Sequence, residues 1–211
     1  MSQFIIEMGS GNTCKNDIGK VHEMIDAVVS VDSGKHEVIF KWQLFGGVPP
    51  NIPLNREVFA WAYAYAYRLG YQTTASVFDI ESLSFLDLFD VPFIKIACRP
   101  KLYHLADLTE NRCVASFYEG SLASVEEEVG WLACVPKYPA AIRDYEDKHS
   151  PLALGEGISD HTVGWKLYKR YNPARIEKHF CLKHDKKNPD AGPFAVTPDE
   201  LAEVLDGGYD T

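Results

Sequence analysis

Two histidines flanked by charged residues are the strongest chemical signal in the sequence. His161 lies in the segment SDHTVG at residues 159–164, and His179 lies in RIEKHF at residues 175–180. The two are too far apart for one helix face, and their spacing suits the ends of consecutive strands in a β/α unit. Neutral imidazole is the commonest metal ligand in proteins, so the pair predicts a metal site. The alternative is that the polar residues around His161 cap a helix while His179 packs in the core.

Two lysines sit inside apolar, strand-like segments. Lys41 lies in VIFKWQ at residues 38–43, and Lys95 lies in PFIKIA at residues 92–97. A buried ammonium without an anionic partner is strongly unfavourable. We therefore expect the two lysines to bind phosphate or carboxylate groups. The alternative is that each reaches solvent or pairs with a structural glutamate.

Glu7 ends the first apolar segment, just before Gly9-Ser10-Gly11, where it could make a polar contact to a substrate. The glycines could instead indicate a phosphate-binding loop. However, the third glycine of the dinucleotide fingerprint is absent, and Gly19-Lys20 is followed by Val21 rather than Ser or Thr. Both nucleotide interpretations are therefore rejected.

These residues must be positioned by short strands that alternate with helical patterns. The candidate strands are residues 4–8, 37–43, 71–76, 93–97, 112–116, 130–135, 153–158 and 174–180. The helical patterns are residues 18–31, 56–69, 82–89 and 162–171. This alternation predicts an α/β fold, the (β/α)8 TIM barrel. Because such barrels rarely have fewer than roughly 200 residues, several helices must be short, above all after Ser116 and after Pro139.

The segment from Trp61 to Tyr67 alternates aromatic residues with alanine, which by itself could indicate a strand. We predict a helix, because alanine is the best helix former and Gly70 stands where a helix C-cap glycine would.

Composition restricts the function further. The chain has 211 residues and a net charge of −9, which predicts one domain over residues 1–211 and disfavours nucleic acid and anionic membranes as partners. The five cysteines contain no C-x-x-C spacing, and no signal peptide or long apolar segment is visible. We expect a cytoplasmic protein.

In order along the chain, these segments resemble the sialic acid synthase family. The matching segments are residues 6–10, 40–43, 78–79, 91–97, 134–139, 159–164, 176–180, 188–190 and 197–201. The family condenses phosphoenolpyruvate with an amino-sugar aldehyde such as N-acetylmannosamine, in a metal-dependent barrel. The resemblance implies a transferase of carbohydrate biosynthesis, with N-acetylneuraminate synthase-like chemistry.

The resemblance also implies roles for individual residues. The histidines that match His161 and His179 hold a divalent ion, usually manganese with magnesium as the alternative, which polarises the aldehyde oxygen. The residues implied to surround phosphoenolpyruvate are Lys41, Ser76, Lys95, Ser116 and Ser159. The residues implied to face the sugar are Glu7, Gln43, Tyr138 and Asp190. The implied reaction is attack by C3 of phosphoenolpyruvate on the aldehyde, addition of water at C2, and loss of phosphate with C–O cleavage.

Several positions depart from the family pattern. Cys98 replaces a serine of the phosphoenolpyruvate pocket, Pro136 replaces an asparagine, and Phe117-Tyr118 replaces a Ser-Thr-Gly-Met segment in part. We also expect the family's C-terminal antifreeze-like domain, which contributes an arginine to the sugar site, to be missing. A homodimer, or a partner chain that completes the sugar site, is an open alternative. Two other functions stay open: a related metal-dependent barrel with aldolase or lyase chemistry on another substrate, and a non-catalytic binding protein.

Overall fold

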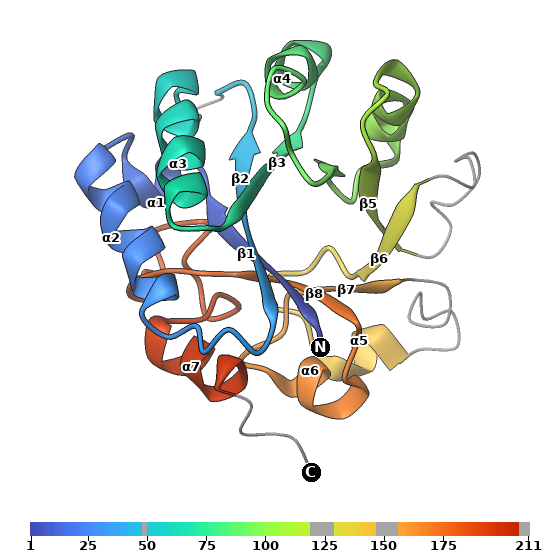
Figure 1. Cartoon of the computed structure of the whole chain (residues 1–211). Coiled ribbons are helices and arrows are strands. Elements are labelled where there is room, and N and C mark those ends of the chain that lie inside the picture. The colour runs from blue at the N-terminus through green and yellow to red at the C-terminus, as the bar shows by residue number, and fades with distance from the viewer. Residues whose placement is uncertain (48–49, 119–128, 147–155, 207–211) are drawn as a thin grey trace.

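The computed structural model describes residues 1–47, 50–118, 129–146 and 156–206. Eight parallel strands pair in sequence order and close into a barrel, because β1 also pairs with β8 (Figure 1). The strands are β1 (Gln3–Gly9), β2 (Glu37–Leu44), β3 (Gln72–Val77), β4 (Ile94–Ile96), β5 (Cys113–Phe117), β6 (Gly130–Cys134), β7 (Gly157–Asp160) and β8 (Arg175–His179). The predicted (β/α)8 TIM barrel is confirmed.

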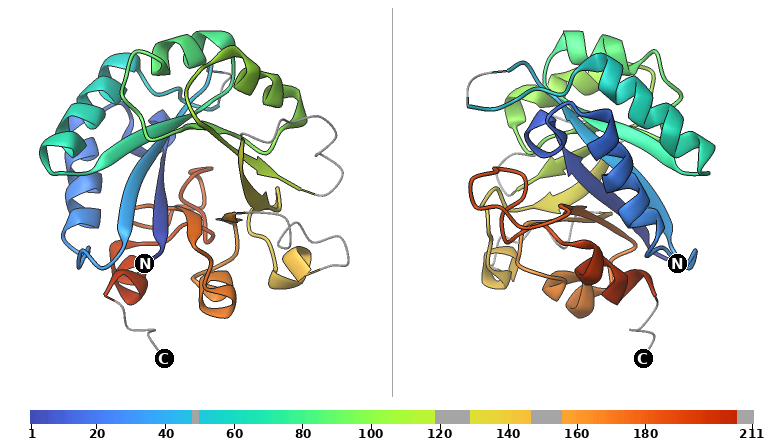
Figure 2. Two further views of the ribbon diagram at one scale, coloured as in Figure 1. Left: turned by 45° about the vertical axis from the view of Figure 1, so that its right-hand side comes forward. Right: turned by 90° about the vertical axis from the view of Figure 1, so that its left-hand side faces the viewer.

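Helices surround the strands on the outside of the barrel, as the views in Figure 2 show. They are α1 (Gly11–Cys14), α2 (Ile18–Val29), α3 (Arg56–Arg68), α4 (Ile80–Leu86), the 3-10 helix η1 (Pro100–Leu108), α5 (Ile142–Glu146), α6 (Lys166–Tyr171) and α7 (Pro198–Leu205). Within the described ranges, no helix combines the length and the apolar character needed to cross a membrane.

The alternating aromatic segment forms the helix α3, as predicted. Ala62 and Ala66 are buried beside Phe59, while the tyrosine rings lie on the more exposed sides of the helix. Gly70 has φ +88, and Tyr71 N–H donates to Ala66 O at 3.0 Å, which closes the helix end as expected for a C-cap glycine. The buried side of the helix is formed by Val58, Phe59, Ala62 and Ala66 at helical spacing, whereas Ala64 is exposed.

Two of the predicted boundaries were wrong. β7 runs from Gly157 to Asp160 rather than over residues 153–158, and residues 153–155 lie outside the described part of the chain. A Cβ on Gly157 would lie 2.3 Å from the carbonyl oxygen of Arg175, so glycine is required where β7 begins beside β8. The helix predicted over residues 162–171 begins only at Lys166, because Asp160 accepts hydrogen bonds from the N–H and hydroxyl of Thr162 and holds a turn there.

The expectation of short helices is met by α5 and α6, which have five and six residues. The segment predicted to be abbreviated after Ser116 continues into residues 119–128, which lie outside the described residues. The segment after Pro139 contains α5. Three helices were not predicted: α1, η1 and α7.

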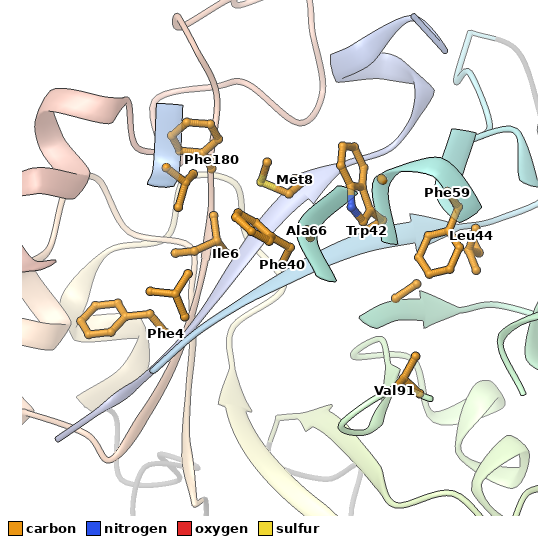
Figure 3. Packing of buried hydrophobic residues seen from close by; sticks show 14 of the residues in the cluster. Phe4, Ile6, Met8, Phe40, Trp42, Leu44, Phe59, Ala66, Val91 and Phe180 are labelled. Atoms are coloured by element: carbon orange, nitrogen blue, oxygen red, sulfur yellow. The ribbon is translucent and has the colours of Figure 1, made fainter. Parts of the chain in front are cut away.

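Side chains alternate between the outside and the inside of the barrel. In β1 and β2, the outward residues Phe4, Ile6, Phe40 and Trp42 pack in the cluster shown in Figure 3, together with residues of the surrounding helices. The inward cluster forms an apolar floor and contains Ile5, Ile39, Phe93, Val114 and Leu132. The next inward side chains, two residues further along each strand, are Glu7, Lys41, Lys95, Ser116 and Cys134. The site therefore lies directly above the apolar floor.

Candidate active site

A cavity of about 490 Å³ lies above the apolar floor, at the carboxyl ends of the strands. This is the face on which TIM barrels carry their active sites. All eleven predicted site residues line it: Glu7, Lys41, Gln43, Ser76, Lys95, Ser116, Tyr138, Ser159, His161, His179 and Asp190. The structure thus brings the predicted set together, while the individual roles stay predictions.

A chain of alternating charges crosses the bottom of the cavity. Lys41 Nζ contacts Glu7 Oε2 and lies 3.5 Å from Glu177 Oε1, and Lys95 Nζ lies 3.7 Å from Glu177 Oε2. All four side chains are almost fully buried. Both lysines therefore pair with buried glutamates, as the structural alternative predicted. Both also line the cavity.

Glu177 is the residue that holds this chain of charges together. Burial would raise the pKa of its carboxyl, but Lys41 and Lys95 outweigh burial and lower that pKa to about 2. Burial lowers the pKa of Lys95, and Glu177 offsets this only in part. The pKa of Lys41 is raised, because its two glutamate neighbours outweigh burial. An ionised Glu177 thus keeps cations beneath the cavity.

The pKa of Glu7 is shifted in the opposite direction to that of Glu177. Burial, the largest effect, raises the pKa of its carboxyl to about 7 despite the contact with Lys41. Glu7 Oε1 also accepts a hydrogen bond of 2.8 Å from the N–H of Gly9. A buried carboxyl that titrates near neutral pH can donate or accept a proton during a reaction.

The two glycines after Glu7 are required by backbone packing. Gly9 has φ +79, and a Cβ on Gly11 would lie 2.4 Å from the carbonyl oxygen of Pro53. The backbone of this loop therefore approaches the residues after β2 too closely for any larger side chain.

Three serine hydroxyls complete the lysine end of the cavity. Ser76 accepts a hydrogen bond from Lys41 at 3.0 Å, and Ser116 accepts one from Lys95 at 2.7 Å. Ser159 donates to Glu177 at 2.9 Å. Ammonium and hydroxyl groups gathered in a dry cavity form a receptor for an oxyanion.

The two histidines lie where β7 and β8 end, with their ring centroids 5.7 Å apart. We call this part of the cavity, formed by His161 and His179, the histidine wall. His161 Nδ1 lies 2.7 Å from Val135 O, which can only accept, so Nδ1 carries a proton and the neutral ring offers Nε2 as a ligand. Burial lowers the pKa of His161, but Cys134 and the Val135 carbonyl outweigh burial and raise it. Burial, His161 and Lys41 hold the pKa of His179 well below its usual range, so this imidazole is neutral. His179 Nδ1 is buried without a hydrogen-bond partner among the described residues.

These features suit a pair of imidazole ligands, although His179 is also buried against Phe194 as the structural alternative expects. His179 borders the cavity, and Asp160 holds a turn rather than capping a helix. No group of three or more His, Cys, Asp or Glu residues within the described ranges is placed to hold a metal. An ion held by the two histidines would therefore leave coordination positions open for water or substrate.

A buried ion pair on the outer side of the same strands supports the histidine wall. Lys178 Nζ lies 3.0 Å from Asp160 Oδ2 and donates to Thr162 O at 2.6 Å, and both charged side chains are fully buried. Asp160 precedes His161 and Lys178 precedes His179 in the sequence. The pair therefore fixes the ends of both strands where the imidazoles enter the cavity.

The outer part of the cavity carries Gln43, Tyr138 and Asp190, three of the four residues implied to face a sugar, whereas Glu7 lies at the bottom. Asp190 accepts hydrogen bonds from Ser10, Asn12 and Gln43 at 3.1, 3.2 and 3.4 Å. The Tyr138 ring lies 4.1 Å from the His161 ring, centroid to centroid. These amide, carboxylate and phenol groups suit a polyhydroxylated ligand.

Sequence reasoning assigned no role to six residues that line the cavity: Phe78, Ala97, Arg99, Cys134, Glu177 and Pro189. Glu177 could have been found, because it lies two residues before His179 and must share its side of the strand. The departures Cys98 and Pro136 also line the cavity. A hydrogen bond with the Cys134 thiol lowers the pKa of Cys98.

Comparisons with known proteins agree with this geometry. The model of the NeuB family matches residues 49–210. A search of curated protein sequences found no match. Among solved structures, the chain is similar to the spore coat polysaccharide biosynthesis protein spsE of Bacillus subtilis, with a TM-score of 0.76 and 21% identity over 98% of this chain and 66% of that one.

Two further structures share the fold. An N-acetylneuraminic acid (sialic acid) synthetase of Leptospira borgpetersenii has a TM-score of 0.72 and 19% identity, over 96% of this chain and 81% of that one. The phospho-2-dehydro-3-deoxyheptonate aldolase (DAHP synthase) of Thermotoga maritima has a TM-score of 0.67 and 10% identity, over 99% of this chain and 69% of that one.

Proposed function

This chain belongs to the NeuB family, and we propose that it is a divalent-metal-dependent synthase that condenses phosphoenolpyruvate with an aldehyde and releases phosphate, in the manner of N-acetylneuraminate synthase. One observation carries the proposal. Two buried lysines with serine hydroxyls and a pair of buried imidazoles line the same cavity. An anionic reactant and a polarised carbonyl can thus meet within one barrel.

The lysine end of the cavity would bind phosphoenolpyruvate. Its carboxylate and phosphate would take hydrogen bonds from Lys41, Lys95 and the hydroxyls of Ser76, Ser116 and Ser159. Because these donors are held by Glu7 and Glu177 before the substrate arrives, little reorganisation is needed on binding.

The histidine wall would hold a divalent ion, manganese or magnesium, through His161 and His179. When bound, such an ion supplies Lewis-acid polarisation of the aldehyde oxygen. The neutral state of His179 and the Nδ1 proton of His161 are the forms that this role requires.

In the proposed reaction, C3 of phosphoenolpyruvate forms a bond to the aldehyde carbon, and the carbonyl oxygen takes up a proton to become a hydroxyl. Water then adds at C2 and returns one proton to the carboxylate that served as donor; the C–O bond to phosphate breaks as the C2 hydroxyl becomes the ketone, and its proton leaves with the phosphate. We assign the proton donor to Glu7, because burial raises the pKa of its carboxyl to about 7. Gln43, Tyr138 and Asp190 would orient the hydroxyl groups of the acceptor.

A second candidate function rests on Cys98 and Pro136, which line the cavity and offer fewer hydrogen-bond donors than the serine and asparagine of the family pattern. They favour a related aldolase or lyase reaction on a different acid. Cleavage of a 2-oxo acid without consumption of phosphoenolpyruvate would support it.

We also propose that a second copy of the chain or another polypeptide contributes to the sugar site. The chain spans 66% of the length of the first similar structure. The free cysteines among the described residues support a reducing cytoplasm.

The proposed function is tested by incubating the protein with phosphoenolpyruvate, manganese and a panel of aldoses and N-acetylhexosamines. We expect phosphate release that requires both phosphoenolpyruvate and an aldehyde, and that is lost in His161→Ala. Phosphate release that is indifferent to the aldehyde, or no consumption of phosphoenolpyruvate with any aldehyde, would refute the proposal.

A further inference from the structure

A second cavity of about 420 Å³ adjoins the catalytic one on the side of β2, β3 and β4. The two cavities share Gln43, Phe78, Arg99 and Asp190, so a bound molecule can extend from one into the other. Asparagine, glutamine and aspartate side chains line most of its polar surface. We call it the outer compartment.

Arg99 is the only cationic side chain among the described residues that line the outer compartment. Its guanidinium has no carboxylate partner and no side-chain hydrogen bond within the described ranges, in contrast to Lys41 and Lys95 below it. It lies over the Phe78 ring, with 5.3 Å between the guanidinium carbon and the ring centroid. Phe78 in turn packs edge-on against Phe45 at 5.7 Å.

The backbone also holds Arg99 in place. Its N–H donates to Ala97 O at 2.6 Å, and its carbonyl accepts from Leu102 N–H at 2.8 Å at the start of η1. A guanidinium presented from a fixed backbone and stacked on an aromatic ring loses little freedom when it binds, and its planar donors match carboxylate and phosphate.

The two carboxylates of the outer compartment are already engaged. Asp79 accepts from the N–H of Ser82 at 2.7 Å, and Asp190 accepts from three neighbouring side chains. They can accept hydrogen bonds from ligand hydroxyls, whereas Arg99 can only donate. The compartment thus combines acceptors for hydroxyl groups with one free cation.

From this arrangement we propose that Arg99 determines acceptor specificity, and that the acceptor is a polyhydroxylated aldehyde with a phosphate group at the end remote from the aldehyde. The aldehyde lies at the histidine wall, the hydroxyls lie along Gln43 and Asp190, and the anionic end meets Arg99. This inference rests on the proposed function, since it names the second substrate of the same site.

The first test measures binding by calorimetry in metal-stripped protein, so that no turnover follows. The ligands are D-erythrose 4-phosphate, D-arabinose 5-phosphate and N-acetyl-D-mannosamine 6-phosphate, each beside its unphosphorylated parent, with and without phosphoenolpyruvate. We expect at least one phosphorylated aldehyde to bind at least tenfold more tightly than its parent. Arg99→Gln should abolish this preference, and Arg99→Lys should retain part of it.

A matched control removes the same charge from the same region. Lys101 is exposed two residues further along and lines neither cavity, so Lys101→Gln should keep the preference of the wild type. Melting temperatures of the variants report whether each one folds. The proposal is overturned if no phosphorylated aldehyde binds better than its parent, or if the preference survives in Arg99→Gln.

The second test determines which of the two substrates Arg99 binds. With an accepted aldehyde, Arg99→Gln should raise the KM for the phosphorylated acceptor at least tenfold, which corresponds to about 1.4 kcal/mol, and leave the KM for phosphoenolpyruvate within about twofold. A rise in the KM for phosphoenolpyruvate instead would assign Arg99 to that substrate and overturn the proposal. Arg99-dependent binding of sugar phosphates without any binding of phosphoenolpyruvate would refute the proposed function, and with it the assignment of the ligand as an acceptor, but would confirm Arg99 as the residue that binds the phosphate.

Discussion

Replacing Glu177 by glutamine removes the negative charge that two buried lysines share. The pKa of this carboxyl falls from 4.5 to about 2, and each pKa unit corresponds to about 1.4 kcal/mol. The folded protein therefore favours ionised Glu177 by about 3 kcal/mol. In Glu177→Gln, Lys41 keeps only Glu7 as an anionic partner, and Lys95 keeps none within the described ranges. We expect the free energy of unfolding at pH 7 to fall by about 3 kcal/mol.

The pH dependence of this loss follows from the direction of the shift. Because the pKa of Glu177 is lower in the folded state than in the unfolded chain, its contribution is complete above about pH 5 and is lost as the pH falls toward 2. The difference between wild type and Glu177→Gln should therefore shrink over that range. Urea denaturation at a series of pH values measures it.

Glu81 offers a matched control, because it forms an exposed ion pair with Arg56 at 2.7 Å. Glu81→Gln should cost less than about 1 kcal/mol, as exposed pairs do. The reasoning would be refuted if Glu177→Gln were as mild as Glu81→Gln at pH 7, or if its cost did not diminish as the pH falls.

Three further predictions concern binding and rate. His179→Ala should weaken manganese binding, measured by calorimetry, at least tenfold and leave the melting temperature within a few degrees; unchanged affinity would remove His179 from the metal site. Lys95→Ala should weaken phosphoenolpyruvate binding at least tenfold, whereas Lys101→Ala on the surface should not; equal affinities would contradict the anion receptor. Because the pKa of Glu7 is about 7 and its protonated form is the proposed donor, kcat/KM should fall as the pH rises through 7, and this limb should be absent in Glu7→Gln. A pH profile shared by both proteins would exclude Glu7 as the proton donor.

The sequence indicated the barrel because eight apolar segments alternate with helical patterns, and eight successive strands are the number that closes a (β/α)8 barrel. The sequence was less informative about strand boundaries that tertiary contacts determine. β7 lies later than predicted, because Gly157 must approach the backbone of Arg175 and Asp160 must meet Lys178 across the strands. Hydrophobicity alone favoured the apolar residues that precede them.

For the site, the sequence indicated which residues line the cavity but not which charged side chains form ion pairs with one another. Glu177 was within reach of the alternation rule, since it shares the inner side of β8 with His179. Arg99 was not, because it follows the end of β4 and only the three-dimensional structure places it over Phe78, between the two cavities. Neither pattern nor spacing predicts such a contact.

The most direct test of the central claim is calorimetric titration of metal-stripped protein with phosphoenolpyruvate, with and without manganese, in the wild type, His161→Ala and Lys95→Ala. The structure predicts binding to the wild type that both substitutions weaken at least tenfold. Absence of binding under both conditions, or binding that neither substitution changes, would contradict the assignment of this cavity to phosphoenolpyruvate.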